Sequence, residues 1–164
     1  MNLQSYINKY GNVEIEEKQL NELLGIKESK VWKPKHGEKY WMIDNVGGSA
    51  SITWFNDDID NLRWKFGNVF KSQEEAQFVV EKHKVEVELQ RYADEHNECE
   101  IDWEDEDQAK YCICFDNKFK KLDTNCNYVS QENNICFTSR EIAKQAIQAI
   151  GEDKIKKYYF GMED

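Results

Sequence analysis

Hydrophobic and polar positions alternate in two separate parts of this chain, and a helical pattern follows each of them. The alternating segments begin at Tyr40 and Tyr111 and have the period of two that is typical of strands. Each leads to a similar heptapeptide, FKSQEEA at 70–76 and FTSREIA at 137–143. The serine in third place can accept a hydrogen bond from a free backbone N–H group and so begin a helix. The sequence therefore predicts an α+β fold of two tandem β-β-β-α units with antiparallel sheets.

In the first unit, the pattern predicts strands at 40–44 and 49–55, joined by a turn at Gly47-Gly48. Apolar residues alternate again over 62–66 and predict a third strand. The helix over 73–96 contains no glycine or proline. At about 1.5 Å per residue it would be roughly 36 Å long, so we expect it to extend from the first sheet toward the second unit.

In the second unit, a turn at Asp116-Asn117 follows the first strand, and a helix follows 137–143. Its apolar residues recur at i, i+3, i+4 and i+7, and Gly151 is placed to end it. A short last helix over 155–160 is expected to return Tyr158 or Tyr159 to the core.

These patterns predict four segments: an N-terminal helical appendage at 1–31, the first unit at 32–97, an acidic connector at 98–109 and the second unit at 110–164. The appendage is predicted from the helical spacing of its apolar residues, which suits packing better than DNA recognition because its second helix is acidic.

The net charge of the chain favours some classes of binding partner over others. The formal net charge is -10, and a negative surface repels phosphate backbones, so direct nucleic-acid binding is disfavoured. A basic partner, such as a protein surface that normally holds nucleic acid, would be attracted. The sequence has no apolar run long enough for a membrane span and no signal-peptide pattern at its start, and its five cysteines lack a disulfide-scaffold spacing. We therefore expect a soluble protein of the cytoplasm.

The acidic connector carries seven carboxylates and no basic residue. They are Glu98, Glu100, Asp102, Glu104, Asp105, Glu106 and Asp107. Either a partner-binding surface or plain solubility explains such a run; calcium binding is disfavoured because the run lacks the glycine and the alternate oxygen spacing of a calcium loop. Ile101 and Trp103 alternate with the acids, which predicts a strand with one solvated face.

The sequence gives weaker support to metal binding, phosphate binding and base stacking. Cys112 and Cys114 lie on one face of a predicted strand, where core packing explains them, and no cysteine or histidine spacing is typical of a metal site. The Gly47-Gly48 turn precedes no helix and is not a phosphate loop. Trp54 and Trp64 suit either a core or base stacking. The sequence thus predicts no metal, no cofactor, no catalytic residue and no enzyme activity.

Three sequence motifs of this chain resemble those of a known group of proteins. They are WKPKHGEKYW at 32–41, GNVFKS at 67–72 and IGEDKIKKY at 150–158. Through them the chain, over residues 12–160, resembles a family of short phage and prophage proteins of low-GC Gram-positive bacteria, particularly clostridia. That family has no assigned activity, so the resemblance implies a context and no site residues. The context is the cytoplasm of a bacterial host, where phage accessory genes often encode inhibitors of host defence.

Together, the resemblance, the charge and the acidic run predict a phage accessory protein that binds and inhibits a host protein. A nucleic-acid-handling defence effector, such as a CRISPR effector or another nuclease, is the expected target, in the manner of an anti-CRISPR. The alternative is a small-ligand binder that sequesters a nucleotide immune signal. In that case aromatic residues of the sheets would stack on the base, and Lys33, Lys35 or Lys39 would bind phosphate.

Overall fold

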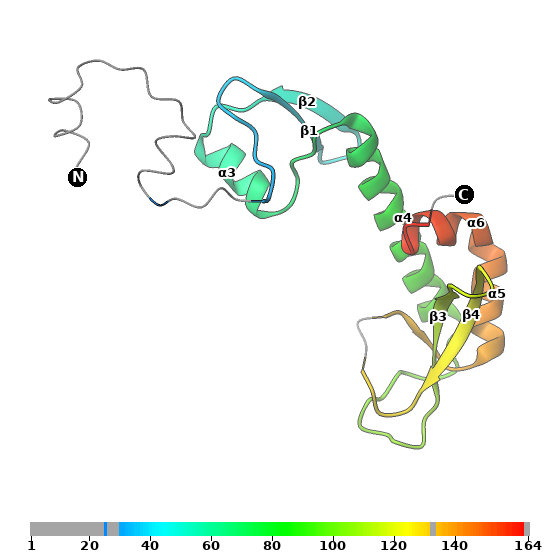
Figure 1. Cartoon of the computed structure of the whole chain (residues 1–164). Coiled ribbons are helices and arrows are strands. Elements are labelled where there is room, and N and C mark those ends of the chain that lie inside the picture. Colours follow the sequence, from blue (N-terminus) through cyan, green and yellow to red (C-terminus); the bar gives the residue numbers. More distant parts are fainter. Residues whose placement is uncertain (1–24, 26–29, 132–133, 163–164) are drawn as a thin grey trace, which may run out of the picture. The chain divides into compact units, whose positions relative to one another are not determined.

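The computed structural model describes residue 25 and residues 30–131 and 134–162 (Figure 1). The chain divides between Pro34 and Lys35 into two units. The predicted N-terminal helices of the 1–31 appendage lie outside the described residues. All the helices and strands that the structure describes lie after residue 34. In chain order they are β1 (Lys39–Ile43), β2 (Ser49–Thr53), α3 (Asp58–Lys65), α4 (Gln73–His96), β3 (Lys110–Asp116), β4 (Lys121–Asn127), β5 (Cys136–Phe137), α5 (Arg140–Ile150), α6 (Glu152–Lys154) and the π-helix η1 (Ile155–Tyr159).

The described chain forms two small antiparallel sheets, β1-β2 and β4-β3-β5, together with helices. This confirms the α+β class. The strand-strand-strand-helix order appears in β3, β4, β5 and α5, whereas the first sheet has two strands. The predicted boundaries of the units within 32–164 stay a prediction.

The β1-β2 hairpin is closed by a tight turn. Asp44 accepts hydrogen bonds through Oδ1 from the N–H groups of Val46 (2.9 Å) and Gly48 (2.8 Å). Gly47 has φ of 80°, and a Cβ atom on Gly48 would lie 2.6 Å from Asp44 Oδ2. Gly47 is therefore suited to the turn by its backbone conformation, and a side chain at position 48 would displace the Asp44 carboxylate that closes the turn.

The prediction of a third strand at 62–66 is wrong, because residues 62–65 belong to α3 and Phe66 caps its end. Asp57 caps this helix by accepting a hydrogen bond from Asp60 N at 2.8 Å. Acidic residues in the first turn and basic residues in the last turn further stabilise it through the helix dipole. Leu62 and Phe66 are 54% and 80% exposed, so the alternation that suggested a buried strand face is not a core pattern.

A buried carboxylate joins α3 to the first sheet. Asp60, only 3% exposed, accepts hydrogen bonds from Tyr40 Oη and from Phe55 N, both at 2.7 Å. Arg63 Nη1 donates to Tyr40 Oη at 3.2 Å, and the Tyr40 ring meets Trp54 edge to face. Burial opposes ionisation of Asp60, but these hydrogen bonds outweigh it and lower its pKa. Burial and the bond to Asp60 raise the pKa of Tyr40 to about 12.

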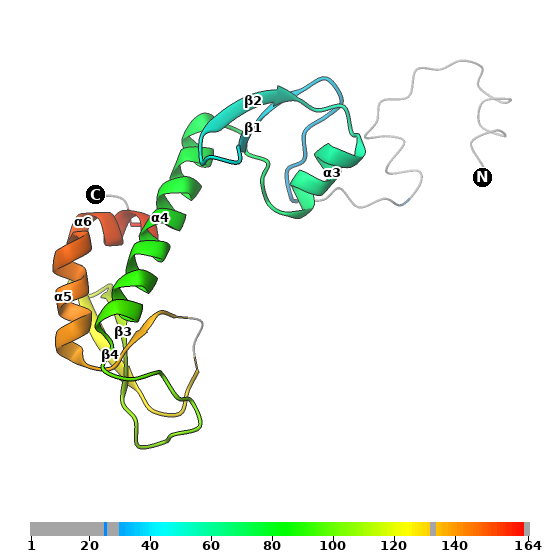
Figure 2. The same ribbon diagram turned by 180° about the vertical axis from the view of Figure 1, so that it is seen from behind.

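Helix α4 begins at the predicted cap. Ser72 Oγ accepts a hydrogen bond from Glu75 N at 3.2 Å, and Glu75 Oε2 accepts one from Lys71 N at 2.9 Å. The helix contacts β1 and β2 as well as α5 and η1, and Figure 2 shows it from the side opposite to Figure 1. It extends from one sheet to the elements around the other, as expected from its length.

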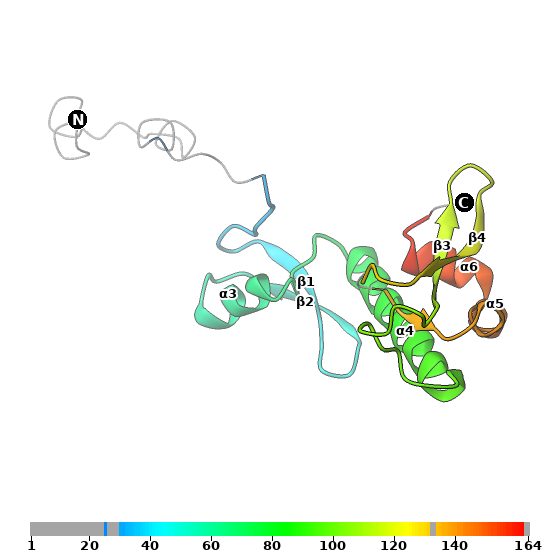
Figure 3. The same cartoon turned by 90° about the horizontal axis from the view of Figure 1, so that it is seen from below.

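The second sheet packs on α5, and together with α4 and η1 they form the main apolar core (Figure 3). The buried members of this core are Val85, Leu89, Ala93, Ile113, Phe137, Ile142, Ala143, Ala146 and Ile155. Ser139 caps α5, and Gly151 ends it at φ of 104°, as predicted. Tyr158 and Tyr159 both pack against the core.

Candidate partner-binding surface

The acidic loop, residues 98–109, joins α4 to β3. All seven of its carboxylate side chains are exposed. Within the described parts of the chain, none of these carboxylates forms an ion pair with a basic side chain. The strand predicted around Ile101 and Trp103 is wrong, because the loop has no strand and these two side chains are half-buried.

Two aspartates shape the loop through hydrogen bonds to its own backbone. Asp102 Oδ1 accepts from Glu104 N at 2.8 Å. Asp105 Oδ1 accepts from Asp107 N at 2.9 Å and from Gln108 N at 3.2 Å. Such local bonds replace the ladder of a sheet and produce turns, which explains why the alternating pattern here gives no strand.

Gln108 ties the two ends of the loop together. Its Oε1 accepts a hydrogen bond from Asp102 N, and its Nε2 donates one to the carbonyl oxygen of Glu100, both at 2.8 Å. The backbone of the loop is therefore fixed from inside while the acidic side chains face solvent.

Lys110, the first residue of β3, holds the acidic loop through its side chain. It is fully buried, and its Nζ donates to the carbonyl oxygens of Asp105 and of Tyr128, the latter at 3.1 Å. The same ammonium group lies 5.4 Å from the centroid of the Trp103 ring. The buried ammonium group thus ties the loop at Asp105 and Trp103 to the start of β3. Sequence reasoning missed this role, for which the only signal was that Lys110 is the first basic residue after the acidic run.

The start of the loop is attached to the second sheet. Asn97, which caps the end of α4, donates from Nδ2 to the carbonyl oxygen of Cys136 at 3.1 Å. Its Oδ1 accepts from Thr138 N at 3.0 Å, and Thr138 Oγ1 accepts from Glu98 N at 3.1 Å. These hydrogen bonds attach the start of the loop to β5 and to Thr138, the residue that follows β5.

A pocket of about 630 Å³, the loop pocket, lies beside the acidic loop. Its lining combines apolar, aromatic and acidic side chains, among them Asp94, Cys99, Glu100, Ile101, Trp103 and Cys136. An aromatic ring next to carboxylates suits the long apolar stem and positive end of a lysine or arginine side chain.

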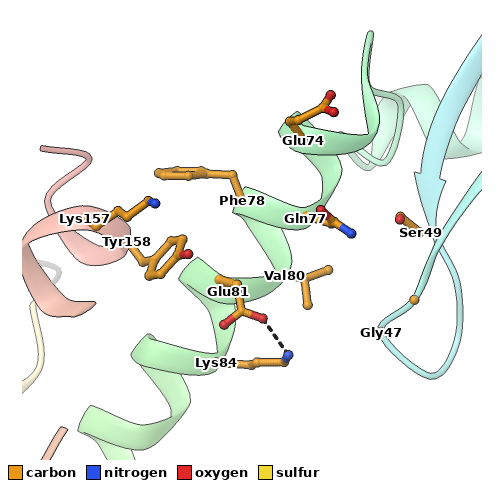
Figure 4. Close-up of a pocket in the computed structure, with 11 residues that line it drawn as sticks. Gly47, Ser49, Glu74, Gln77, Phe78, Val80, Glu81, Lys84, Lys157 and Tyr158 are labelled. Carbon is orange, nitrogen blue, oxygen red and sulfur yellow. Dashed lines mark hydrogen bonds and ion pairs between the residues drawn. The ribbon is translucent and has the colours of Figure 1, made fainter. Parts of the chain in front are cut away.

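A second pocket of about 500 Å³, the helix pocket, lies among the β1-β2 turn, α4 and η1 (Figure 4). The rings of Phe78 and Tyr158 are 5.5 Å apart, and Lys157 extends beside them. Lys84 is paired with Glu81 at 2.7 Å, as the dashed line in the figure marks.

Two of the lysines predicted for the nucleotide-binding alternative are not at these pockets. Lys35 and Lys39 are exposed and line neither of them, and Lys33 is also exposed. Trp54 is 1% exposed, which confirms the core interpretation of that side chain, and Trp64 is half-buried.

No group of three or more histidine, cysteine, aspartate or glutamate side chains among the described residues is arranged to hold a metal ion. Nor does any helix in that part of the chain have the length and apolar character needed to cross a membrane.

Comparison with known proteins identifies no relative: no family model matches this chain, and neither does a curated protein or a solved structure. The resemblance to phage proteins stays a prediction.

Proposed function

We propose that this protein binds and inhibits a host protein, and that the acidic loop is its binding surface. The observation that carries the proposal is a loop with seven exposed carboxylates whose backbone is fixed by its own side chains and by buried Lys110. A surface used only for solubility needs charge but no fixed conformation. A preformed loop binds with a smaller loss of conformational entropy than a flexible one.

The partner is a basic protein surface. Unpaired carboxylates attract such a surface over the Debye length of about 8 Å at physiological salt and accelerate association. A nuclease or another nucleic-acid-handling defence effector presents such a surface, since it must hold phosphate groups. The acidic loop would compete for that site, which makes the protein an inhibitor of the anti-CRISPR kind without any catalytic step of its own.

The loop pocket supplies an anchor for this complex. A lysine or arginine of the partner would place its stem against Ile101 and Trp103 and its charge near Asp94 or Glu100. Interfaces depend on a few buried anchors of this kind, while charges at the rim mainly affect the association rate.

The test is capture of partners from a clostridial host lysate at low and high salt, followed by mass spectrometry. We expect a host nucleic-acid-binding protein at low salt and its release at high salt. The captured protein is then assayed with and without the acidic protein, and loss of its nuclease or DNA-binding activity is expected. Failure to retain any host protein at low salt, or full activity of the captured one, contradicts the proposal.

The helix pocket favours a second function, the sequestration of a small aromatic ligand such as a nucleotide. Its volume lies within the range of about 300–1,000 Å³ that is typical of ligand sites. Phe78 and Tyr158 offer aromatic surface and Lys157 a positive charge, but Glu74 and Glu81 also line the pocket and would repel phosphate groups. Native mass spectrometry of the protein purified from host cells tests this function, because a bound nucleotide would appear as added mass.

A further inference from the structure

Two cysteine side chains from neighbouring strands meet in the second sheet. Cys112 of β3 and Cys136 of β5 are direct partners in the antiparallel register. Their Sγ atoms lie 2.9 Å apart, closer than the van der Waals contact of two sulfur atoms. Both side chains are buried, at 2% and 8% exposure. Packing alone does not require two sulfur atoms to approach this closely.

The backbone already suits a covalent bond between them. Directly opposed residues of antiparallel strands have Cα atoms about 4.5–5.5 Å apart and side chains on the same face. Disulfides span Cα separations of about 4.4–6.8 Å. The two thiols can therefore be joined with little movement of β3 or β5.

Of the two cysteines, Cys136 is the more exposed, at 8% against 2%. Cys136 lines the loop pocket, whereas Cys112 does not. Cys136 is therefore the residue that an external reactant meets first, and Cys112 lies behind it in position to complete the reaction.

A neighbouring cysteine is a poor competitor. Cys114 lies on the same face of β3, two residues beyond Cys112, but its partner in the register is Asp123 of β4. Burial, and then the negative charges of Asp123 and Asp116, raise the pKa of the Cys114 thiol. Cys114 has no cysteine opposite it in the register with which the same bond could form.

We propose that Cys112 and Cys136 form a disulfide-forming site that reacts with a low-molecular-weight disulfide of the glutathione type. The Cys136 thiolate attacks one sulfur of the small disulfide, and one small thiol leaves. The Cys112 thiolate then attacks the Cys136 sulfur of the mixed disulfide and releases the second small thiol. The two protein thiols give up two electrons and two protons, which convert the small disulfide into two thiols.

The new bond fastens β5 to β3, and Asn97 at the start of the acidic loop is held by the Cys136 carbonyl oxygen. Closing a loop of roughly 25 residues lowers the unfolding equilibrium constant on the order of 100-fold and raises Tm by about 10 °C. The site does not depend on whether the acidic loop binds a partner.

The experiment uses the full chain in glutathione buffers that range from fully reduced to fully oxidised. Samples are quenched, alkylated, and analysed by intact mass and peptide mapping. We expect an intramolecular crosslink between Cys112 and Cys136 in oxidising buffer, its reversal in reducing buffer, and the rise in Tm. The unaltered protein suffices for this measurement, so it does not depend on the folding of any variant.

Two matched variants sharpen the test. Cys112→Ser should leave Cys136 trapped as the mixed disulfide with glutathione, because the second attack is lost. Cys114→Ser, on the same face of the same strand, should form the crosslink as the unaltered protein does. Absence of the 112–136 crosslink in oxidising buffer, or pairing of Cys136 with Cys99 in its place, would overturn the proposal.

Discussion

Around the first sheet few side chains are buried and one of them is a carboxylate, whereas the second sheet packs into an apolar core drawn from several elements. Asp60 joins α3 to β1 and β2 through hydrogen bonds, while Phe137, Ile142 and Leu89 hold the second sheet to its helices by packing. Two parts of the chain with similar sequence patterns are thus stabilised by different forces. A repeated sequence pattern therefore predicts the helix caps better than it predicts the contacts between elements.

The largest effect is expected in the apolar core. Phe137 is fully buried in β5, and Phe137→Ala should lower the free energy of unfolding by about 3–5 kcal/mol through lost burial and a cavity. Urea unfolding followed by circular dichroism measures the change. Phe119, which is 63% exposed, provides the matched control, and Phe119→Ala should change stability by less than about 0.5 kcal/mol. Equal losses in the two variants would show that β5 is not part of the core.

A smaller, pH-dependent effect is expected at the polar junction of the first sheet. Asp60→Asn removes the charge that accepts two short hydrogen bonds, and should cost about 1.5–3 kcal/mol at pH 7. The pKa of Asp60 is lowered in the folded protein, so its contribution is fully present above the unfolded pKa of about 3.9 and is lost as the pH falls through the folded value.

The urea midpoints of Asp60→Asn and the unaltered protein should therefore differ at pH 7 and converge as the pH is lowered below about 4. A difference that stays constant from pH 7 to pH 3 would mean that the Asp60 charge does not stabilise the fold.

The smallest effect is expected on the exposed side of α3. Leu62 is 54% exposed, so Leu62→Ser should change the free energy of unfolding by less than about 0.5 kcal/mol. A buried strand at 62–66 would instead make this substitution cost several times as much. Thermal unfolding of the variant thus distinguishes helix α3 from the strand that the alternation predicted.

The sequence was informative where a single residue type determines local geometry. Ser72, Ser139 and Gly151 marked helix ends correctly, because capping requires a hydroxyl group or a positive φ at a defined place. The strand prediction at 62–66 failed because three alternating apolar residues are compatible with a short helix whose cap, Asp57, also looks like a turn residue.

Two buried charged residues, one at the acidic loop and one at the first sheet, could not be predicted from the sequence for a related reason. Buried Lys110 and buried Asp60 are charged residues, which hydrophobic patterning assigns to the surface. Only their partners, two backbone carbonyl oxygens in one case and a tyrosine hydroxyl with a backbone N–H group in the other, explain their burial. The acidic residues themselves could be predicted as exposed, but their fixed conformation could not.

The proposal that the acidic loop is the binding surface is tested most directly by reversing charges in the loop and measuring the affinity for the captured host protein. Glu104→Lys with Glu106→Lys is the variant of choice, because these side chains do not form the turns that Asp102 and Asp105 stabilise. Glu141→Lys with Asp153→Lys changes the net charge equally at exposed positions of α5 and α6, and serves as the control. Binding is measured by titration at several salt concentrations.

We predict that the loop variant binds at least about 10-fold more weakly and loses most of its salt dependence, while the control binds nearly as the unaltered protein does. Equal affinities for the loop variant and the control would contradict the central claim that the acidic loop is the binding surface.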